Sequence, residues 1–143
     1  MECEFPRINS NKEEIIKYFK ETKTIAVIGV SPDPKKDSHR VAKYLLKAGY
    51  NMIPIYPKEE EILGQKVYRS LLEIDKPVDM VVVFRKPEAV DAVADACIKR
   101  GDVKVLWTQI GIVNNAAAQK AKDAGIEVVQ NRCAMVDHRE LLG

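Results

Sequence analysis

Cations and small polar residues of this sequence gather where apolar runs end, in a pattern that suits a phosphorylated ligand. The segment from Gly29 to Arg40 reads GVSPDPKKDSHR, joins an apolar run to a helical pattern and carries Lys35 and Lys36. Backbone N–H groups and the positive dipole end at the start of a helix form a natural site for a phosphate. The GxGxxG and Walker patterns are missing, since Gly29 alone matches. The loop therefore predicts an anion site but does not indicate which nucleotide would bind there.

The residue after the second apolar run narrows the ligand class. There the sequence reads YPK, ending at Lys58, whereas NAD-binding domains usually offer Asp or Glu at this place to hold the ribose hydroxyls. A lysine favours a phosphate on the adenosine ribose, as in NADP or coenzyme A. After the third run, Phe84 and Arg85 offer an aromatic or guanidinium plane for an adenine, and Lys86 adds a second cation.

Catalytic and metal-binding patterns are not recognisable. His39 and His138 have no Ser or Cys in a nucleophile elbow to activate. The three cysteines, Cys3, Cys97 and Cys133, are widely spaced and form no CxxC pair, which predicts neither a disulfide framework nor a zinc site and suits a reducing cytoplasm. Cys97 falls on an apolar helical stripe. Cys133 follows the last apolar run, where it could meet a ligand thiol, although a buried and inert thiol is the simpler expectation.

The composition excludes several classes of protein. The chain has 143 residues, 46% of them hydrophobic, with 23 Lys and Arg against 21 Asp and Glu and a formal charge of +2. We expect one globular domain, 1–143, in the cytoplasm. A near-neutral chain with 6% aromatic residues is a poor nucleic-acid binder. Neither a signal peptide nor a membrane-spanning run is present, so we expect no membrane association.

Five apolar, β-branched runs alternate with helical patterns, and nothing between them predicts a tight hairpin. This alternation predicts an α/β fold with a doubly wound, parallel five-stranded sheet of the Rossmann type. Of the two common orders, we expect 3-2-1-4-5 rather than a flavodoxin-like order. Ligands then bind at the carboxyl ends of the strands. The predicted strands are 24–28, 51–56, 80–84, 103–107 and 126–129.

Start signals predict where the helices lie between these strands. A capping-box spacing at Ser10 predicts a helix over 10–22, and Ser38 stands as a cap before the helix that ends near Gly49. Pro87 opens a helix that ends at Gly101. A short helix starts at 70, an Ala-rich helix runs from 114 or 115 to 125, and a short helix near 137–142 closes the chain.

Several segments together resemble the small stand-alone CoA-binding domain proteins. These segments, in order, are VIGVSPDPKKDSHRVA, YP, ILGQKVY, VVVFRKP, the GI segment at 110–113 and NRC at 131–133. They are also similar to the N-terminal CoA-binding domain of the succinyl-CoA synthetase alpha subunit and of ADP-forming acyl-CoA synthetases. The resemblance covers Thr24 to Arg139.

The resemblance implies a coenzyme A site formed by the loops that follow the strands. The residues for the diphosphate are Gly29, Val30, Ser31, Ser38, His39 and Arg40. Those for the adenosine with its ribose phosphate are Pro57 and Lys58, and those for the adenine edge are Phe84 and Arg85. Those for the pantetheine arm are Gln109, Ile110 and Gly111. Cys133 is the candidate for a thiol contact. No residue is assigned to catalysis or to a metal.

The expected function is non-covalent binding of coenzyme A or an acyl-CoA without catalysis. The resemblance implies that a complete synthetase also needs a domain with a phosphorylated His and an ATP-grasp partner, and the chain ends before either. One alternative is an NADP-linked oxidoreductase or redox sensor on the same fold. Another is a CoA-binding regulatory subunit that docks on a synthetase. A protein partner or a homo-oligomer is compatible with each of these hypotheses.

Overall fold

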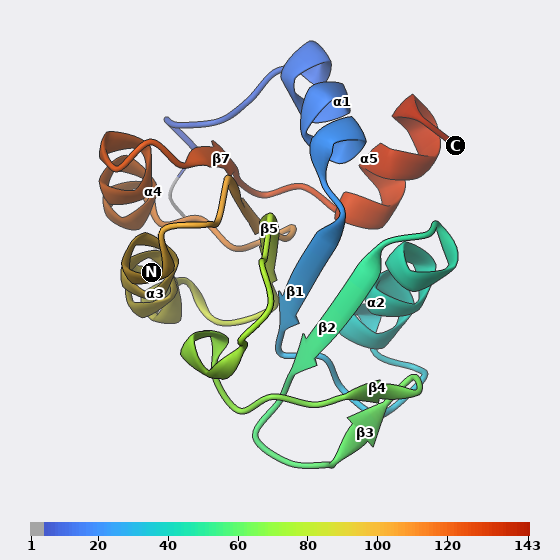
Figure 1. Cartoon of the computed structure of the whole chain (residues 1–143). Helices are drawn as coiled ribbons and strands as arrows, with labels where there is room; N and C mark the ends of the chain where they lie inside the picture. Colours follow the sequence, from blue (N-terminus) through green and yellow to red (C-terminus); the bar gives the residue numbers. More distant parts are fainter. Residues whose placement is uncertain (1–4) are drawn as a thin grey trace.

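A parallel five-stranded sheet forms the centre of the molecule (Figure 1). The structure is a computed structural model that describes residues 5–143, so Cys3 lies outside the described residues. The strands are β1 (Thr24–Ile28), β2 (Asn51–Ile55), β5 (Met80–Val83), β6 (Val105–Thr108) and β7 (Glu127–Val129), and all neighbouring pairs are parallel. The predicted α/β, Rossmann-like fold class with five parallel strands is therefore confirmed.

The predicted strand order needs a correction. The order is β2-β1-β5-β6-β7, which is 2-1-3-4-5 in the numbering of the five predicted strands and not 3-2-1-4-5. The place beside β2 is taken by a single parallel bridge between Ile55 and Tyr68. The chain reaches it through a small antiparallel pair, β3 (Glu61–Ile62) and β4 (Gln65–Lys66). Because the Tyr68 segment pairs with β2 at one residue only, it does not count as a strand. The third full strand is therefore β5, which pairs with β1 on the side away from β2.

Helices cover both faces of the sheet, as a doubly wound fold requires (Figure 1). One face carries α1 (Lys12–Glu21), α2 (Asp37–Lys47) and α5 (Ala134–Leu141). The other carries α3 (Val90–Arg100) and α4 (Asn115–Asp123), with the 3-10 turns η1 (Leu71–Glu73) and η2 (Pro87–Ala89). Pro87 thus opens a 3-10 turn that leads into α3.

Side chains of the central strands alternate between the two layers. On β1, Ile25 and Val27 pack toward α1, α2 and α5, whereas Ala26 and Ile28 pack toward α3 and α4. The sequence predicts this two-sided burial from its continuous apolar runs, because a strand of a parallel sheet has a helix layer on each face. Trp107 is fully buried in the first of these layers.

Two helix starts differ from the prediction. Asn11, not Ser10, caps α1, and its side chain and that of Glu14 form a reciprocal capping box. Ser10 instead donates its hydroxyl to the Val128 carbonyl, 2.8 Å away on β7. α2 begins at Asp37 after Lys36, so Ser38 lies within the first turn and is not the cap. At α1 an adjacent residue takes the capping role, whereas at α2 the Ser38 hydroxyl accepts a hydrogen bond from the Ser31 N–H and no side chain of the N-cap residue replaces it.

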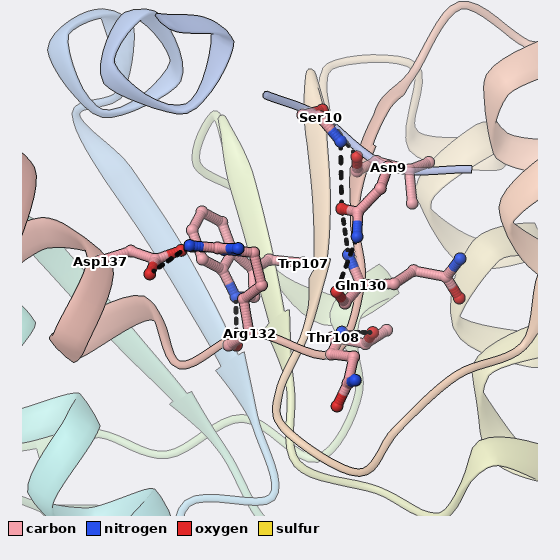
Figure 2. A network of polar contacts seen from close by, with 9 residues as sticks. Asn9, Ser10, Trp107, Thr108, Gln130, Arg132 and Asp137 are labelled. Carbon is pink, nitrogen blue, oxygen red and sulfur yellow. Dashed lines mark hydrogen bonds and ion pairs between the residues drawn. The ribbon is translucent and has the colours of Figure 1, made fainter. Parts of the chain in front are cut away.

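The segment before α1 lies along β7 (Figure 2). Asn9 and Gln130 exchange two hydrogen bonds: Asn9 Nδ2 donates to the Gln130 carbonyl at 3.0 Å, and the Gln130 N–H donates to Asn9 Oδ1 at 2.9 Å. These bonds satisfy backbone groups at the open edge of the sheet. Among residues 5–143 no helix is long and apolar enough to cross a membrane.

Candidate ligand site at the carboxyl edge of the sheet

Gly29 lies where the carboxyl ends of three neighbouring strands, β2, β1 and β5, meet. Its N–H donates to the Ile55 carbonyl at 2.8 Å, and the Phe84 N–H donates to the Ile28 carbonyl at 2.8 Å. A Cβ on Gly29 would lie 2.4 Å from the Phe84 carbonyl oxygen, and its φ is +91°. Only glycine fits here. The residue is required for the sheet itself, whatever ligand binds next to it.

The loop after β1 folds back on the first turn of α2. The Ser31 N–H donates to Ser38 Oγ at 3.0 Å, and His39 Nδ1 donates to the Ser31 carbonyl at 2.9 Å. Three of the residues predicted for the diphosphate are therefore in direct contact. Both Ser38 and His39 are buried, and Val30 is fully buried in the core. The loop has a fixed shape in which Val30 contributes packing.

The start of α2 has backbone N–H groups that no side chain within residues 5–143 caps, since the N-cap residue Lys36 makes no such bond. The first N–H groups of any helix lack partners within the helix, so they are free to bind an anion. Arg40, which the sequence suggests as a phosphate-binding cation, is ion-paired with Asp37 and also donates to the Lys35 carbonyl at 3.1 Å. Lys35 and Lys36 have no ion-pair partner within the described chain.

The loop after β2 is held by a residue that sequence reasoning missed. Arg69 donates through one guanidinium nitrogen to the carbonyls of Tyr56 and Lys58, at 3.0 and 2.8 Å. It thereby fixes the backbone of Pro57 and leaves the Lys58 side chain exposed, with no ion-pair partner in the part of the chain described. The only available signal was its place directly after Tyr68, at the end of the ILGQKVY motif.

The loop after β5 carries exposed cations. Arg85 and Lys86 are exposed, and neither forms an ion pair with any residue from 5 to 143. Phe84 is half-buried and packs against the layer of α1, α2 and α5. The following turn is tied to the start of α4, because Asn114 Nδ2 donates to the Pro87 carbonyl at 2.9 Å.

The loop after β6 is a fixed turn. Thr108 Oγ1 donates to the Ile112 carbonyl at 2.7 Å, and the Gly111 N–H donates to Asn131 Oδ1 at 2.7 Å. Gln109 is 5% exposed, whereas its neighbour Ile110 is 69% exposed. Asn131, with φ +61°, belongs to the NRC segment of the resemblance but was assigned no role at the site. Its contact with Gly111 depends on the pairing of β6 with β7, which cannot be read locally.

Cys133 is the N-cap residue of α5, which begins at Ala134, earlier than the predicted 137. Next to it, Arg132 forms two bonds with the buried Asp137 carboxylate, at 2.6 and 3.0 Å, and this partner raises the pKa of Arg132 (Figure 2). The Trp107 indole donates to the Arg132 carbonyl at 2.8 Å. Cys133 is partly buried, and its contact with a ligand thiol stays a prediction. Cys97 is fully buried, and burial raises its pKa to about 12, in keeping with a packing role.

Two hollows of the described chain lie elsewhere. One of about 490 Å³ is lined by residues near the C-terminal ends of α3 and α4, among them Gly101, Asp102 and Gly125. The other, about 280 Å³, lies between α1 and the first residues of β6 and β7. Both belong to the amino edge of the sheet, where open α/β sheets do not usually bind ligands. Within residues 5–143 no group of three or more His, Cys, Asp or Glu could hold a metal ion.

The length of the carboxyl edge indicates the shape of the ligand that it suits. Parallel strands lie about 4.8 Å apart, so the exits of β2 and β6 are separated by three spacings, about 14 Å. Free cations lie at the β2, β1 and β5 exits, and the buried amide of Gln109 and the exposed Ile110 lie at the β6 exit. An extended molecule with phosphates at one end and a neutral, partly apolar arm at the other matches this arrangement.

Comparisons with known proteins agree on one family. The chain is 42% identical over 130 residues to an uncharacterized protein, YneT, of Bacillus subtilis, covering 91% of this chain and 96% of that protein. A hypothetical protein from Pyrococcus horikoshii OT3 has the same fold, with a TM-score of 0.91, 40% identity and full coverage of both chains.

Larger relatives are enzymes of which this chain spans only a part. Identity to the alpha subunit of ADP-forming acetate-CoA ligase II of Pyrococcus furiosus is 29% over 122 residues, which cover 85% of this chain but 27% of the subunit. The model of the family described as CoA binding domain matches residues 23–139. With most of its length inside that match, the chain belongs to the CoA binding domain family.

Proposed function

We propose that the protein binds coenzyme A or an acyl-CoA non-covalently at the carboxyl edge of the sheet and performs no chemistry on it. One observation carries the proposal. Around this edge, cationic side chains have no ion-pair partner among residues 5–143, namely those of Lys35, Lys36, Lys58, Arg85 and Lys86. Coenzyme A carries a diphosphate and a ribose phosphate, and unpaired cations in fixed loops attract such a ligand.

The loops suggest how the ligand lies. The diphosphate would bind the uncapped N–H groups at the start of α2, next to the joined residues Ser31, Ser38 and His39. The ribose phosphate would lie at Lys58, whose backbone Arg69 fixes. The adenosine would then contact Pro57 on one side and the half-buried Phe84 with Arg85 on the other.

The rest of the ligand would continue along the sheet edge. The β6 exit lies about 14 Å from the β2 exit, a distance that the pantetheine arm is long enough to span. There it would meet Gln109, Ile110 and Gly111.

Structural roles of the histidines support a binding function without catalysis. His39 donates to the Ser31 carbonyl and is buried. His138 contacts the rings of Phe19, Tyr44 and Tyr50, with centroid distances of 5.1, 5.5 and 5.6 Å. Within residues 5–143, neither ring forms a hydrogen bond with a serine hydroxyl or a cysteine thiol, and His138 Nδ1 contacts the Tyr44 hydroxyl. The ligase relatives are several times longer, so a shared coenzyme site with the reaction carried out elsewhere is consistent with their lengths.

Two further hypotheses remain distinct from this one. The basic β2 exit also fits the ribose phosphate of NADP, which an oxidoreductase or redox sensor would bind. A role as the coenzyme-binding partner of a synthetase is favoured by a specific observation, namely that one relative is a subunit of a ligase. In that case the coenzyme site is the same and a protein partner supplies the remaining domains.

Calorimetric titration with coenzyme A, dephospho-CoA and NADP tests the proposal. We expect coenzyme A to bind and dephospho-CoA to bind about tenfold more weakly, since it lacks the ribose phosphate and its charge-assisted bonds. In Lys58→Ala the two ligands should bind alike, whereas Lys20→Ala, on the exposed side of α1, should keep the difference.

Each contrary result of the titration would reject a different part of the proposal. No binding of coenzyme A would reject the function, and equal affinities of the unsubstituted protein for coenzyme A and dephospho-CoA would reject the role of Lys58. Tighter binding of NADP than of coenzyme A would favour the oxidoreductase.

A further inference from the structure

Glu59, the residue after Lys58, has a backbone conformation that its side chain does not favour. Its φ is +67°, in the left-handed region that glycine adopts freely, that asparagine and aspartate tolerate and that glutamate rarely adopts. Such a conformation persists only where surrounding contacts hold it, and it is found most often at functional sites. The conformation of Glu59 therefore requires an explanation from the contacts around it.

Among residues 5–143, the two other non-glycine residues with a positive φ have local explanations. Leu63 (φ +55°) and Gly64 (φ +74°) form the two-residue turn between β3 and β4, a kind of turn that requires a positive φ. Asn131 (φ +61°) is of a type that tolerates this region, and its side chain accepts from the Gly111 N–H. Glu59 lies outside any hairpin turn and is of neither tolerant type, so a contact from elsewhere in the fold must hold it.

The loop of residues 56–60 is anchored at both ends by backbone hydrogen bonds. The Tyr56 N–H donates to the Tyr68 carbonyl at 3.1 Å, and the Val67 N–H donates to the Glu60 carbonyl at 3.0 Å. Residues 57–59 lie between these anchors, and within residues 5–143 they take part in no hydrogen bond between backbone groups. The anchors fix where the loop begins and ends, so a side chain must hold its middle.

Arg69 holds the middle of this loop. Its Nη1 donates to the Tyr56 carbonyl at 3.0 Å and to the Lys58 carbonyl at 2.8 Å. The Lys58 carbonyl belongs to the peptide group between Lys58 and Glu59, so its direction depends on the φ of Glu59. The Arg69 Nη2 lies 3.8 Å from the fully exposed Glu60 carboxylate, and an ion pair of this kind contributes little. Arg69 therefore acts mainly through the two carbonyls.

The position of this backbone decides where the Lys58 ammonium can reach. Lys58 is exposed and has no ion-pair partner within the described part of the chain. A lysine on a loosely held loop samples many positions, and its immobilisation against a phosphate costs conformational entropy. A backbone that is already held in one conformation lowers this cost. The unfavourable φ of Glu59 in the free protein is consistent with a loop that is preorganised for a ligand.

We infer that Arg69 is a positioning residue: it holds the Lys58 carbonyl and the left-handed conformation of Glu59, and thereby directs the Lys58 side chain toward the ribose phosphate of the ligand. The inference rests on the proposed function. It predicts that Arg69 sets the selectivity for a ribose phosphate, measured as the ratio of the dissociation constants for dephospho-CoA and coenzyme A, without touching the ligand. It also predicts that a glycine at position 59 partly offsets the loss of Arg69, because glycine adopts a positive φ without steric cost.

The test compares Arg69→Met alone with Arg69→Met combined with either Glu59→Gly or Glu59→Ala. Methionine donates no hydrogen bond to the loop. Glycine and alanine both remove the Glu59 carboxylate, but glycine alone accepts the positive φ, so this pair separates the backbone effect from the change in charge. Arg139→Met, at an exposed arginine of α5, is the matched control. Calorimetry gives both dissociation constants, and the melting temperature of each ligand-free variant shows whether it is folded.

We expect the selectivity for coenzyme A to fall from about tenfold to about twofold in Arg69→Met and to return to about fivefold when Glu59→Gly is added. The addition of Glu59→Ala should leave it at about twofold, and Arg139→Met should leave it at about tenfold.

Unchanged selectivity in Arg69→Met would overturn the inference. Equal selectivity after addition of Glu59→Gly and of Glu59→Ala would also overturn it, because the guanidinium would then act through its charge or by direct contact with the ligand. Loss of the folded state in Arg69→Met would do the same, since a residue that only positions a surface loop is not needed for the fold. Failure of the unsubstituted protein to bind coenzyme A would reject the proposed function itself.

Discussion

His138 is a residue whose ionisation depends on the fold. Its ring is packed edge-on against Phe19, Tyr44 and Tyr50, and the Tyr44 hydroxyl lies 2.9 Å from Nδ1. Burial lowers the pKa of this imidazole below its ordinary value, because the charged form loses water and gains no anion. The neutral imidazole is thus part of the packing between α5 and the helices next to it.

This burial predicts how stability depends on pH. The unfolded chain takes up a proton on this histidine near pH 6.5, while the folded protein does so only at lower pH. As the pH falls through the interval between the two values, the unfolded state binds more protons and the folded state loses stability. Above that interval both states are neutral, and the contribution is constant.

We expect the melting temperature to fall between pH 7 and pH 5, and His138→Phe, which keeps an aromatic ring, to flatten this part of the curve. Asp102 and Glu127 also have lowered pKa values, owing mainly to bonds with Arg100 and with Lys122 and Tyr18. Their stabilisation is lost as the pH falls below about 5, whereas the effect of His138 begins near pH 7. Identical curves for the variant and the unsubstituted protein would show that His138 does not titrate in this way.

At the residue scale, sequence reasoning finds side chains whose own chemistry identifies them. Lys58 stands where NAD-binding domains have a carboxylate, and its type alone marks it. Arg69 and Asn131 were missed because they act on backbone atoms of distant segments. Arg40 was expected at the diphosphate, and in the structure it forms an ion pair with Asp37, three residues earlier on α2. Such local pairing competes with ligand binding and depends on side-chain geometry.

At the scale of elements, Gly29 follows β1, donates to the last residue of β2 and lies against the Phe84 backbone that follows β5. Any side chain here meets the Phe84 carbonyl and needs an unfavourable φ. Gly49, at the end of α2, has φ +104°, but a Cβ placed there would meet no atom of the described chain within 4 Å. A substitution at Gly49 therefore measures the cost of the positive φ without a steric collision.

We expect Gly29→Ala to lower the free energy of unfolding by about 3 kcal/mol or more, and Gly49→Ala by about 1–2 kcal/mol. The larger loss at Gly29 comes from the collision with backbone that holds two strands together. Urea denaturation of both variants measures it. A cost at Gly29 equal to that at Gly49 would mean that the β5 backbone can move aside easily.

The elements themselves follow closely from the sequence, and their arrangement follows less well. Continuous apolar runs predicted the five strands to within two residues at each end, because burial on both faces leaves a plain pattern. The strand order failed because the Tyr68 segment pairs with β2 through one bridge, which no pattern distinguishes from a loop. The start of α1 was misplaced because Ser10 and Asn11 could each serve as a cap.

At the scale of the whole molecule, the two edges of the sheet differ. Within residues 5–143, the carboxyl edge has fixed loops with unpaired cations and a buried amide nitrogen without a partner, and the amino edge has a hollow lined by Gly101 and Gly125. The account assigns the ligand to the first edge, from charge and from the uncapped start of α2, and not from the size of a cavity. An open edge suits a long, flexible ligand that lies across several strand ends.

The central claim is tested most directly by titrating the 15N-labelled protein with coenzyme A and following its backbone amides by NMR. Glycine residues lie at both edges of the sheet, so their amide signals report on the two edges separately. The account predicts that the amide signals of Gly29, Ser31 and Gly111 shift or broaden on binding, while those of Gly101 and Gly125 stay in place. Shifts confined to Gly101 and Gly125, or a spectrum that coenzyme A leaves unchanged, would contradict it.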